Sequence, residues 1–174
     1  MNNETRITIV NGNLHVENAH ITFKNFEGHS DQYNMNGAKS FALVVPEEFV
    51  DMLQANGWKL RIKPDTKGEG DFVTLKVKVK FNEQGPGVYL NSVGRTTKLN
   101  NSTVGMLDHI RMTNIAMIIR PYDWALNGNS GRTAYLQAME AEQIIDAISA
   151  KYQAQEFAQA ADMDVQDPSM IENF

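Results

Sequence analysis

Lysine and arginine alternate with apolar residues in two neighbouring segments of the chain, "WKLRIKP" and "DFVTLKVKVKF". A side-chain period of two is typical of β-strands and places the cations of each segment on one face. These cations are Lys59, Arg61 and Lys63 in the first segment and Lys76, Lys78 and Lys80 in the second. Successive cations on such a face lie about 6 to 7 Å apart, close to the phosphate spacing of an extended single nucleic-acid strand. The pattern therefore predicts a groove that binds a polyanion.

The six cations also have a simpler explanation. Lysines on an exposed strand protect the edge of a sheet from aggregation. If the two strands pair, however, six like charges lie side by side, and their repulsion destabilises the sheet unless an anion binds there. No acid stands between the cations of either segment, so we favour the polyanion groove.

Aromatic residues near these charges could stack on nucleobases, and such stacking tolerates any base. Each candidate lies beside a cation in the sequence or shares a predicted strand face with one. The stacking candidates are Tyr33, Phe72, Tyr122 and Trp124, and the further phosphate candidates are Lys39, Arg95, Arg120 and Arg132. The other aromatics of the strand-like segments, Phe41, Trp58, Phe81 and Tyr135, are predicted to belong to the core.

Motifs of catalysis are absent from the sequence. The glycine-rich "GEG" and "GPG" lack the Lys-Ser/Thr of a phosphate-binding loop, and neither GxSxG nor HExxH occurs. The chain has no cysteine, so disulfides and thiolate metal sites are excluded. The four histidines (His15, His20, His29 and His109) and the acids of the body are scattered, which argues against a metal-dependent nuclease. We expect no enzyme activity, no metal and no cofactor.

The elements that must position the basic residues are mostly strands. Residues 6–26 are predicted to be extended on both sides of an Asn-Gly-Asn turn at 11–13, and so is the segment "SFALVV". A helix is predicted from Pro46 to the Asn-Gly at 56 and 57, and a second short helix is predicted in "NSTVGMLDHI", capped by Asn101 or Ser102. "NIAMIIRPYDW" and "RTAYLQAMEA" are predicted to form a hairpin. The expected fold is mostly β, an OB-fold-like five-stranded barrel with extra strands, one or two short helices and a C-terminal helix.

Charge divides the chain into a body and a tail. All 16 lysines and arginines lie at or before Lys151 with 16 of the 21 acids, so the net charge of −5 belongs to the last residues. Within the body, residues 59–132 hold 12 bases against six acids. We expect a binding domain at 1–142, a helix at 143–161 and a flexible acidic tail at 162–174. The candidate tail residues are Asp162, Asp164, Asp167, Glu172 and Phe174.

These segments resemble the single-stranded DNA-binding proteins of bacteriophages. The similarity covers residues 20–140 and depends on "ITFKNFEGHSDQYNMNGAKSFALVV", on "GW" at 57 and 58, on "GRTT" at 94–97, and above all on "IIRPYDWALNGNSGRTAYL". The resemblance implies an OB-fold core that binds single-stranded DNA without sequence preference, in phage DNA replication and recombination. The acidic tail ending in Phe174 adds support, because bacterial and phage proteins of this type commonly end in an acidic tail with a terminal aromatic that docks on replication and repair proteins.

The tail departs from the bacterial pattern in two places, since bacterial tails have denser acids and a different residue before the last one. Bacterial tails have proline before the final phenylalanine, whereas this chain has Asn173, so the resemblance implies a phage-encoded partner. A mobile polyanion beside a cationic groove can also occupy the groove until DNA displaces it. The helix at 143–161 could pack on its own barrel or on a second copy, which would give a homodimer.

Two other points follow from the sequence. No apolar run reaches the roughly 18 residues of a membrane span, and the N-terminus lacks a signal-peptide pattern. We therefore expect no membrane association and a cytoplasmic location, in the host cell if a phage encodes the protein. The alternative function is a structural or interaction module whose basic face binds an acidic protein, and it predicts no DNA binding at low salt.

Overall fold

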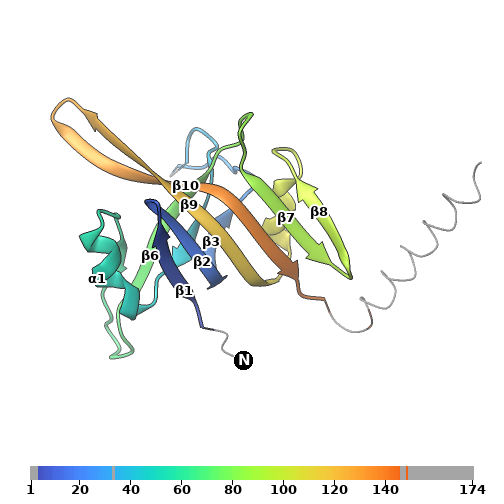
Figure 1. The fold of residues 1–174 in the computed structure, drawn as a ribbon, viewed down its shortest axis with the longest axis horizontal. Coiled ribbons are helices and arrows are strands. Elements are labelled where there is room, and N and C mark those ends of the chain that lie inside the picture. The colour runs from blue at the N-terminus through green and yellow to red at the C-terminus, as the bar shows by residue number, and fades with distance from the viewer. Residues whose placement is uncertain (1–3, 33, 146–147, 149–174) are drawn as a thin grey trace, which may run out of the picture.

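The computed structural model describes residues 4–32, 34–145 and 148, and it is built mainly from strands (Figure 1). The strands are β1 (Arg6–Val10), β2 (Asn13–Ala19), β3 (Ile21–Asn25), β4 (Lys39–Val44), β5 (Arg61–Lys63), β6 (Phe72–Val79), β7 (Gly87–Ser92), β8 (Arg95–Leu99), β9 (Met112–Leu126) and β10 (Asn129–Gln143). The helices are α1 (Glu47–Ala55) and the 3₁₀ helix η1 (Val104–His109). No helix in the described ranges is long and apolar enough to cross a membrane.

All ten strands join one sheet, in the order β1-β2-β9-β10-β6-β4-β3, with β5 paired to β6 and with β7 paired to β10 and β8. Strand β10 is the hub of this arrangement, because it runs antiparallel to β9, parallel to β6 near Ala134 and parallel to β7 from Ala138 onward. The end strands β1 and β3 do not pair in the described part of the chain. The mostly β class is therefore confirmed, while the backbone pairing gives an open, strongly branched sheet rather than a closed five-stranded barrel.

The local sequence explains several element boundaries. Pro46 precedes α1 with φ −60°, and Glu47 and Glu48 occupy its first turn, where the helix dipole favours acids. The helix ends at Asn56, and Gly57 follows with φ +96°, a conformation that glycine adopts without steric cost. This helix confirms the prediction from the sequence.

Other predicted boundaries need correction. The turn after "RITIV" is confirmed, but the extended segment that follows it divides into β2 and β3, and "WKLRIKP" forms a strand only at Arg61–Lys63. The short helix η1 begins after Thr103 rather than after Asn101 or Ser102. The predicted hairpin is confirmed as β9 and β10, but β10 continues to Gln143, so the C-terminal helix does not begin there. Apart from 144, 145 and 148, the predicted helix and tail lie outside the described residues.

One hydrophobic cluster lines the inner side of the sheet. Strand β6 contributes Val73, Leu75, Val77 and Val79, all buried. Phe41 and Trp58 are buried as predicted, and Phe81 packs against the cluster while partly exposed. Tyr135 was predicted to be a core residue, and this is wrong, because it is only half-buried and its pairing places it on the outer face, as described below.

Candidate nucleic-acid interface

The two basic segments pair with each other. Strand β5 runs antiparallel to β6, with Arg61 opposite Thr74 and Lys63 opposite Phe72. Directly opposed residues project from the same side of a sheet, so these four side chains share the outer face with Lys76. The prediction that both basic segments line one sheet surface is therefore met by the strand register.

The same face continues over four further strands. Lys78 on β6 is opposite Ser40 on β4 and Tyr135 on β10, and Tyr135 is opposite Arg120 on β9. On the other side, Ser40 is opposite Asn25 on β3. This row of five residues crosses five strands, or about 19 Å at a strand spacing of about 4.8 Å.

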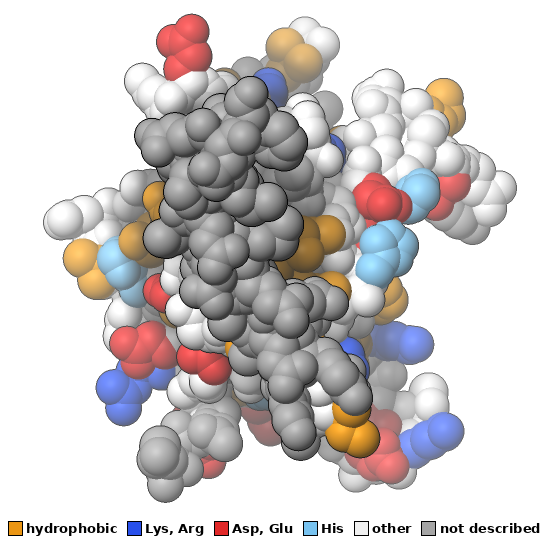
Figure 2. All heavy atoms as spheres, turned by 90° about the vertical axis from the view of Figure 1, so that its right-hand side faces the viewer, with side chains coloured by type: hydrophobic (Ala, Val, Ile, Leu, Met, Phe, Trp, Pro, Cys, Tyr) orange, Lys and Arg blue, Asp and Glu red, His pale blue; other side chains and the backbone are white. Residues whose placement is uncertain are grey.

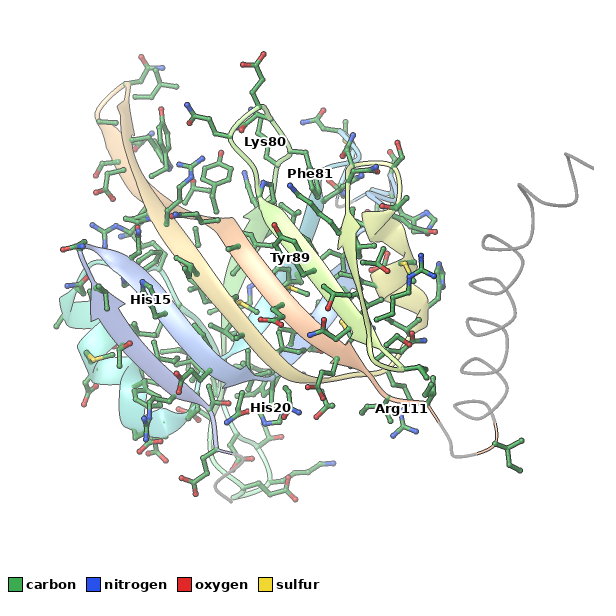
Figure 3. All side chains as sticks on the ribbon, turned by 45° about the vertical axis from the view of Figure 1, so that its right-hand side comes forward. His15, His20, Lys80, Phe81, Tyr89 and Arg111 are labelled. Atoms are coloured by element: carbon green, nitrogen blue, oxygen red, sulfur yellow. The ribbon has the colours of Figure 1, made fainter. Side chains whose placement is uncertain are left out.

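We call this outer surface the basic face. It consists of Arg61, Lys63, Phe72, Thr74, Lys76, Lys78, Ser40, Ala42, Thr133, Tyr135, Arg120, Tyr122 and Trp124. Lys59 and Lys80 extend it just beyond the ends of β5 and β6, and both are exposed. Lys80 and Arg120 line one polar hollow of about 410 Å³, although they are 40 residues apart in the sequence. Figure 3 shows Lys80 at one end of the molecule, far from Arg111 and His20.

A ribbon formed by the free ends of β9 and β10 projects beyond the rest of the sheet (Figure 1). Tyr122 is 53% exposed and Trp124 is 41% exposed on the side that continues the basic face. The indole of Trp124 lies directly over Gly131, so a Cβ at that glycine would fall 2.7 Å from its Cζ2 atom. A partly exposed flat ring that packs on the backbone is suited to stacking on a base.

Tyr135 organises the root of this ribbon. Its ring lies 6.2 Å from that of Tyr122 in an edge-on arrangement, and the Arg120 guanidinium lies 4.9 Å from its centroid. A cation above an aromatic ring is attracted by the ring quadrupole. The contact holds Arg120 on the basic face. Sequence reasoning missed Tyr135 because period two alone does not say which side of a strand faces the core.

A second hollow, of about 360 Å³, opens on the basic face between β3 and β5. Its lining includes Phe23, Ser40, Arg61, Thr74 and Lys76. Phe23 is 69% exposed and was not among the predicted site residues. The exposure follows from a register irregularity between Thr22 and Asn25, where Phe23 adopts φ +51°. No sequence signal marks this bulge.

Lys39 lies away from the basic face. Its register partner is the core residue Val79, so it projects from the opposite side of the sheet. The Lys39 ammonium donates hydrogen bonds to the backbone oxygen of Asn101 and to its Oδ1 at 2.7 Å, and it lies 5.9 Å from the ring of Phe81. Burial lowers the pKa of Lys39 from its ordinary value. These contacts indicate a lysine that joins β4 to the 101–103 turn.

Arg132 also faces away from the basic face. Its guanidinium donates to Asp123 at 2.6 and 3.0 Å and to the backbone oxygen of Asn56 at 2.6 Å, and it lies 5.1 Å from the Trp58 ring. The hydrogen bond from Arg132 lowers the pKa of Asp123, and the reciprocal bond raises that of Arg132. These contacts give Arg132 a structural role, in which it joins the ribbon to the end of α1. Its phosphate contact stays a prediction.

The remaining predicted residues are not brought to this surface by the described structure. Arg95 is the first residue of β8, which forms a hairpin with β7, and β7 pairs with β10. Arg95 is not without a partner. Tyr33 and the tail residues Asp162 to Phe174 lie outside the described residues. Their roles stay predictions.

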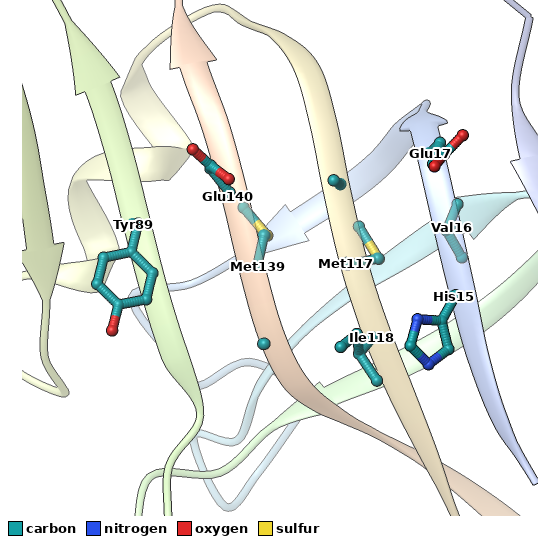
Figure 4. Close-up of a pocket in the computed structure, with 10 residues that line it drawn as sticks. His15, Val16, Glu17, Tyr89, Met117, Ile118, Met139 and Glu140 are labelled. Carbon is teal, nitrogen blue, oxygen red and sulfur yellow. The ribbon is translucent and has the colours of Figure 1, made fainter. Parts of the chain in front are cut away.

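A third hollow, of about 380 Å³, crosses β2, β9, β10 and β7 (Figure 4). Tyr89 and His15 stand on opposite sides of it, with Glu17 and Glu140 at its rim. Asn91 donates a 2.9 Å hydrogen bond to Glu140. The two carboxylates make this trough unsuited to a phosphate backbone, and they limit the cationic surface at this end of β9.

Histidine and acidic side chains gather at one edge of the face shown in Figure 2. In the structure, Glu27 contacts His29 at 2.5 Å and His109 at 3.0 Å. The hydrogen bond from His109 is the main cause that lowers the pKa of Glu27. Asp108 accepts hydrogen bonds from the backbone N–H groups of Phe26 and Glu27. These contacts fasten η1 to the chain after β3.

The comparisons with known proteins agree with the family expected from the sequence. The family model described as "Putative phage ssDNA-binding domain" matches residues 3–173. The chain belongs to this family of phage single-stranded DNA-binding domains.

Solved structures similar to this chain come from bacteriophage Enc34. The C-terminal truncation of its single-stranded DNA-binding protein shares 11% identity over 81% of this chain and 97% of that chain, with a TM-score of 0.48. The protein of the same phage in complex with single-stranded DNA shares 12% identity over 78% of this chain and 88% of that chain, with a TM-score of 0.49. Among curated proteins, none matches.

Proposed function

We propose that this protein binds single-stranded DNA without sequence preference, along the basic face, in phage DNA replication and recombination. The observation that carries the proposal is the row from Arg120 through Tyr135 and Lys78 to Ser40, which joins the ribbon to the two basic strands. The cations follow the backbone of the strand, and the exposed rings of Phe72, Tyr122 and Trp124 stack on its bases.

The charged groups of the basic face suit a surface that binds a polyanion, because they are exposed lysines and arginines. Contacts to phosphates give affinity without reading the sequence. Ring faces do the same, because every base can stack.

The acidic tail has two proposed tasks. Asp162, Asp164, Asp167 and Glu172 occupy the basic face weakly until DNA displaces them, and Phe174 then docks on a replication or recombination protein. The support is the complete separation of charge in the sequence, with no base after Lys151. An aromatic ring beside acidic residues forms a recognisable peptide motif.

The test is a fluorescence-anisotropy titration of labelled oligo-dT at two salt concentrations, with the full-length protein and with a form that stops after Lys151. We expect tight binding that weakens steeply with salt and strengthens on truncation. If neither form binds at low salt while circular dichroism shows both folded, single-stranded DNA binding is refuted, and an acidic protein partner becomes the better candidate. If both forms bind equally tightly, the tail does not compete for the basic face.

A further inference from the structure

We propose that the hollow between β3 and β5 holds one nucleobase of the bound strand, stacked on Phe23 and hydrogen-bonded to the hydroxyl of Thr74. The proposal rests on the function proposed above, since it names the ligand group that the basic face takes up at this place. A hollow of about 360 Å³ lies within the range of small-molecule sites, roughly 300 to 1,000 Å³.

Thr74 supplies the first observation. It is 4% exposed and lines the floor of the hollow together with Ala42, which is 6% exposed. Its hydroxyl makes no hydrogen bond to another described residue, and neither does that of Ser40 in the same lining. Thr74 as a residue is buried, but its hydroxyl oxygen is open to the hollow, because in the described part of the chain Trp58 Nε1 is the side-chain polar atom that is both fully buried and without a partner. A base that displaces water from the hollow must therefore give these hydroxyls new hydrogen bonds. A ligand with polar edge atoms would satisfy both groups.

Phe23 supplies the second observation. Strand residues with large apolar side chains normally turn them toward the core, but this ring is 69% exposed and borders the hollow. Its φ of +51° is rare for a bulky residue. Strained backbone of this kind is concentrated at binding sites, where the surrounding structure holds it in place. The ring therefore forms a preorganised wall on which a base can stack.

The surrounding charges place a phosphate beside the base rather than inside the hollow. Arg61 and Lys76 line one side of it, and Asp31 lines another. A cation on the β5 and β6 side attracts the backbone of the strand, whereas the negative charge of Asp31 disfavours a phosphate on its side of the hollow. The strand would therefore cross β5 and β6 with one base turned toward β3.

The polar groups of the wall explain why the hollow accepts different bases. Asn25 exchanges hydrogen bonds with the backbone of His29, at 2.7 and 3.2 Å. Asn34 donates to the backbone oxygens of His29 and Ala38, at 2.9 and 2.8 Å. Both amides are thus engaged in shaping the loop. The two hydroxyls can each donate or accept, so they pair with the edge of a purine or of a pyrimidine.

The experiment uses the full-length protein and two matched pairs of variants. Phe23→Ala removes the ring and Phe23→Tyr keeps it; Thr74→Val removes the hydroxyl at nearly equal volume and Thr74→Ser keeps it. Affinity for oligo-dT is measured by anisotropy, and stacking by the fluorescence of single 2-aminopurine bases placed along the oligonucleotide. Thermal unfolding followed by circular dichroism confirms that each variant is folded.

We expect Phe23→Ala to weaken binding about 5- to 150-fold, the range for one lost base stack, and to restore 2-aminopurine fluorescence at one position of the oligonucleotide. Thr74→Val weakens binding several-fold, while Phe23→Tyr and Thr74→Ser stay close to the wild type. If the wild type binds and both disruptive variants bind and quench equally well, the nucleobase site is refuted while the proposed function stands. Absence of binding by the folded wild type refutes both.

Discussion

Reversing the charge of Lys76 and Lys78 together is the sharpest perturbation of the basic face. Both side chains are exposed on β6, and they face Ala42, Ser40 and Tyr135 on the flanking strands. Lys76→Glu with Lys78→Glu should abolish binding of single-stranded DNA. It should leave the core intact, because the buried side chains of β6 point the other way.

The magnitude can be worked from the number of cations. Seven of the predicted cations lie on or next to the basic face: Lys59, Arg61, Lys63, Lys76, Lys78, Lys80 and Arg120. If each neutralises one phosphate, the slope of log K against log salt is roughly −0.7 × 7, or about −5, and loss of two contacts reduces it to about −3.5. Binding that depends on counterion release is taken as equal for the two proteins at about 1 M salt. At 0.05 M salt the smaller slope then makes the affinity of the variant roughly 60-fold lower than that of the wild type. Repulsion by the new carboxylates lowers the affinity further.

Anisotropy titrations of oligo-dT at several salt concentrations measure both quantities. Lys76→Gln with Lys78→Gln separates loss of contact from added repulsion, and it should show the reduced slope with a smaller loss of affinity. Arg6→Glu with Lys98→Glu is the matched control, because it changes the net charge by the same amount as the double Glu variant but at β1 and β8. This control should bind DNA nearly as the wild type does. Undiminished affinity of the double Glu variant, or an equal loss in the β1 and β8 control, would refute the assignment of the site.

Other predictions concern the ribbon. Trp124→Ala should weaken DNA binding by about 1 to 3 kcal/mol with an unchanged melting temperature, and a loss of stability instead would make the ring structural. Gly131→Ala places a Cβ 2.7 Å from the indole, so it should shift the fluorescence of Trp124 while that of buried Trp58 stays constant; an unchanged spectrum would contradict the contact. Arg132→Ala should destabilise the fold by about 1 to 3 kcal/mol in urea unfolding, whereas a variant as stable as the wild type but weak in DNA binding would return Arg132 to the phosphate contacts. Because Arg132 lowers the pKa of Asp123, this carboxylate stabilises the fold above about pH 4 and less as the pH falls through its lowered pKa, and Asp123→Asn should remove that part of the acid dependence measured by unfolding at several pH values.

The basic strands show what kind of inference from the sequence succeeds. Strict alternation fixes which residues of β6 share a side, and the mixture of valine with lysine decides which side is buried, so Lys76 and Lys78 were found directly. Whether the two basic segments pair was left open by the sequence, and the strand register shows that β5 pairs with β6. By contrast, the helix predicted from Gln143 failed at its start, since the last residues of β10 gain more from pairing with β9 and β7 than their helix propensity offers.

The failures at the site have a common cause, which is that period two assigns residues to sides but does not orient the sides. Tyr135 and Arg132 are three residues apart on β10 and therefore face opposite ways. Tyr135 was predicted for the core and Arg132 for the DNA-binding surface, whereas Tyr135 lies on the outer face and Arg132 lies against Trp58 on the other side. Only the register with β6 and β9 decides that Tyr135 joins Lys78 and Arg120 on the outer face.

The sequence by itself determined the mostly β class, the family, the cationic strands and the separation of the acidic tail, because these depend on composition, local periodicity and motif. The tertiary structure decided how distant segments meet. It brought Arg120 and Lys80 to one hollow, turned Lys39 and Arg132 away, and exposed Phe23 through a bulge at the hollow that Thr74 also lines. Such relations arise from long-range strand register and from backbone irregularities, which stabilise the fold as a whole and leave no local mark in the chain.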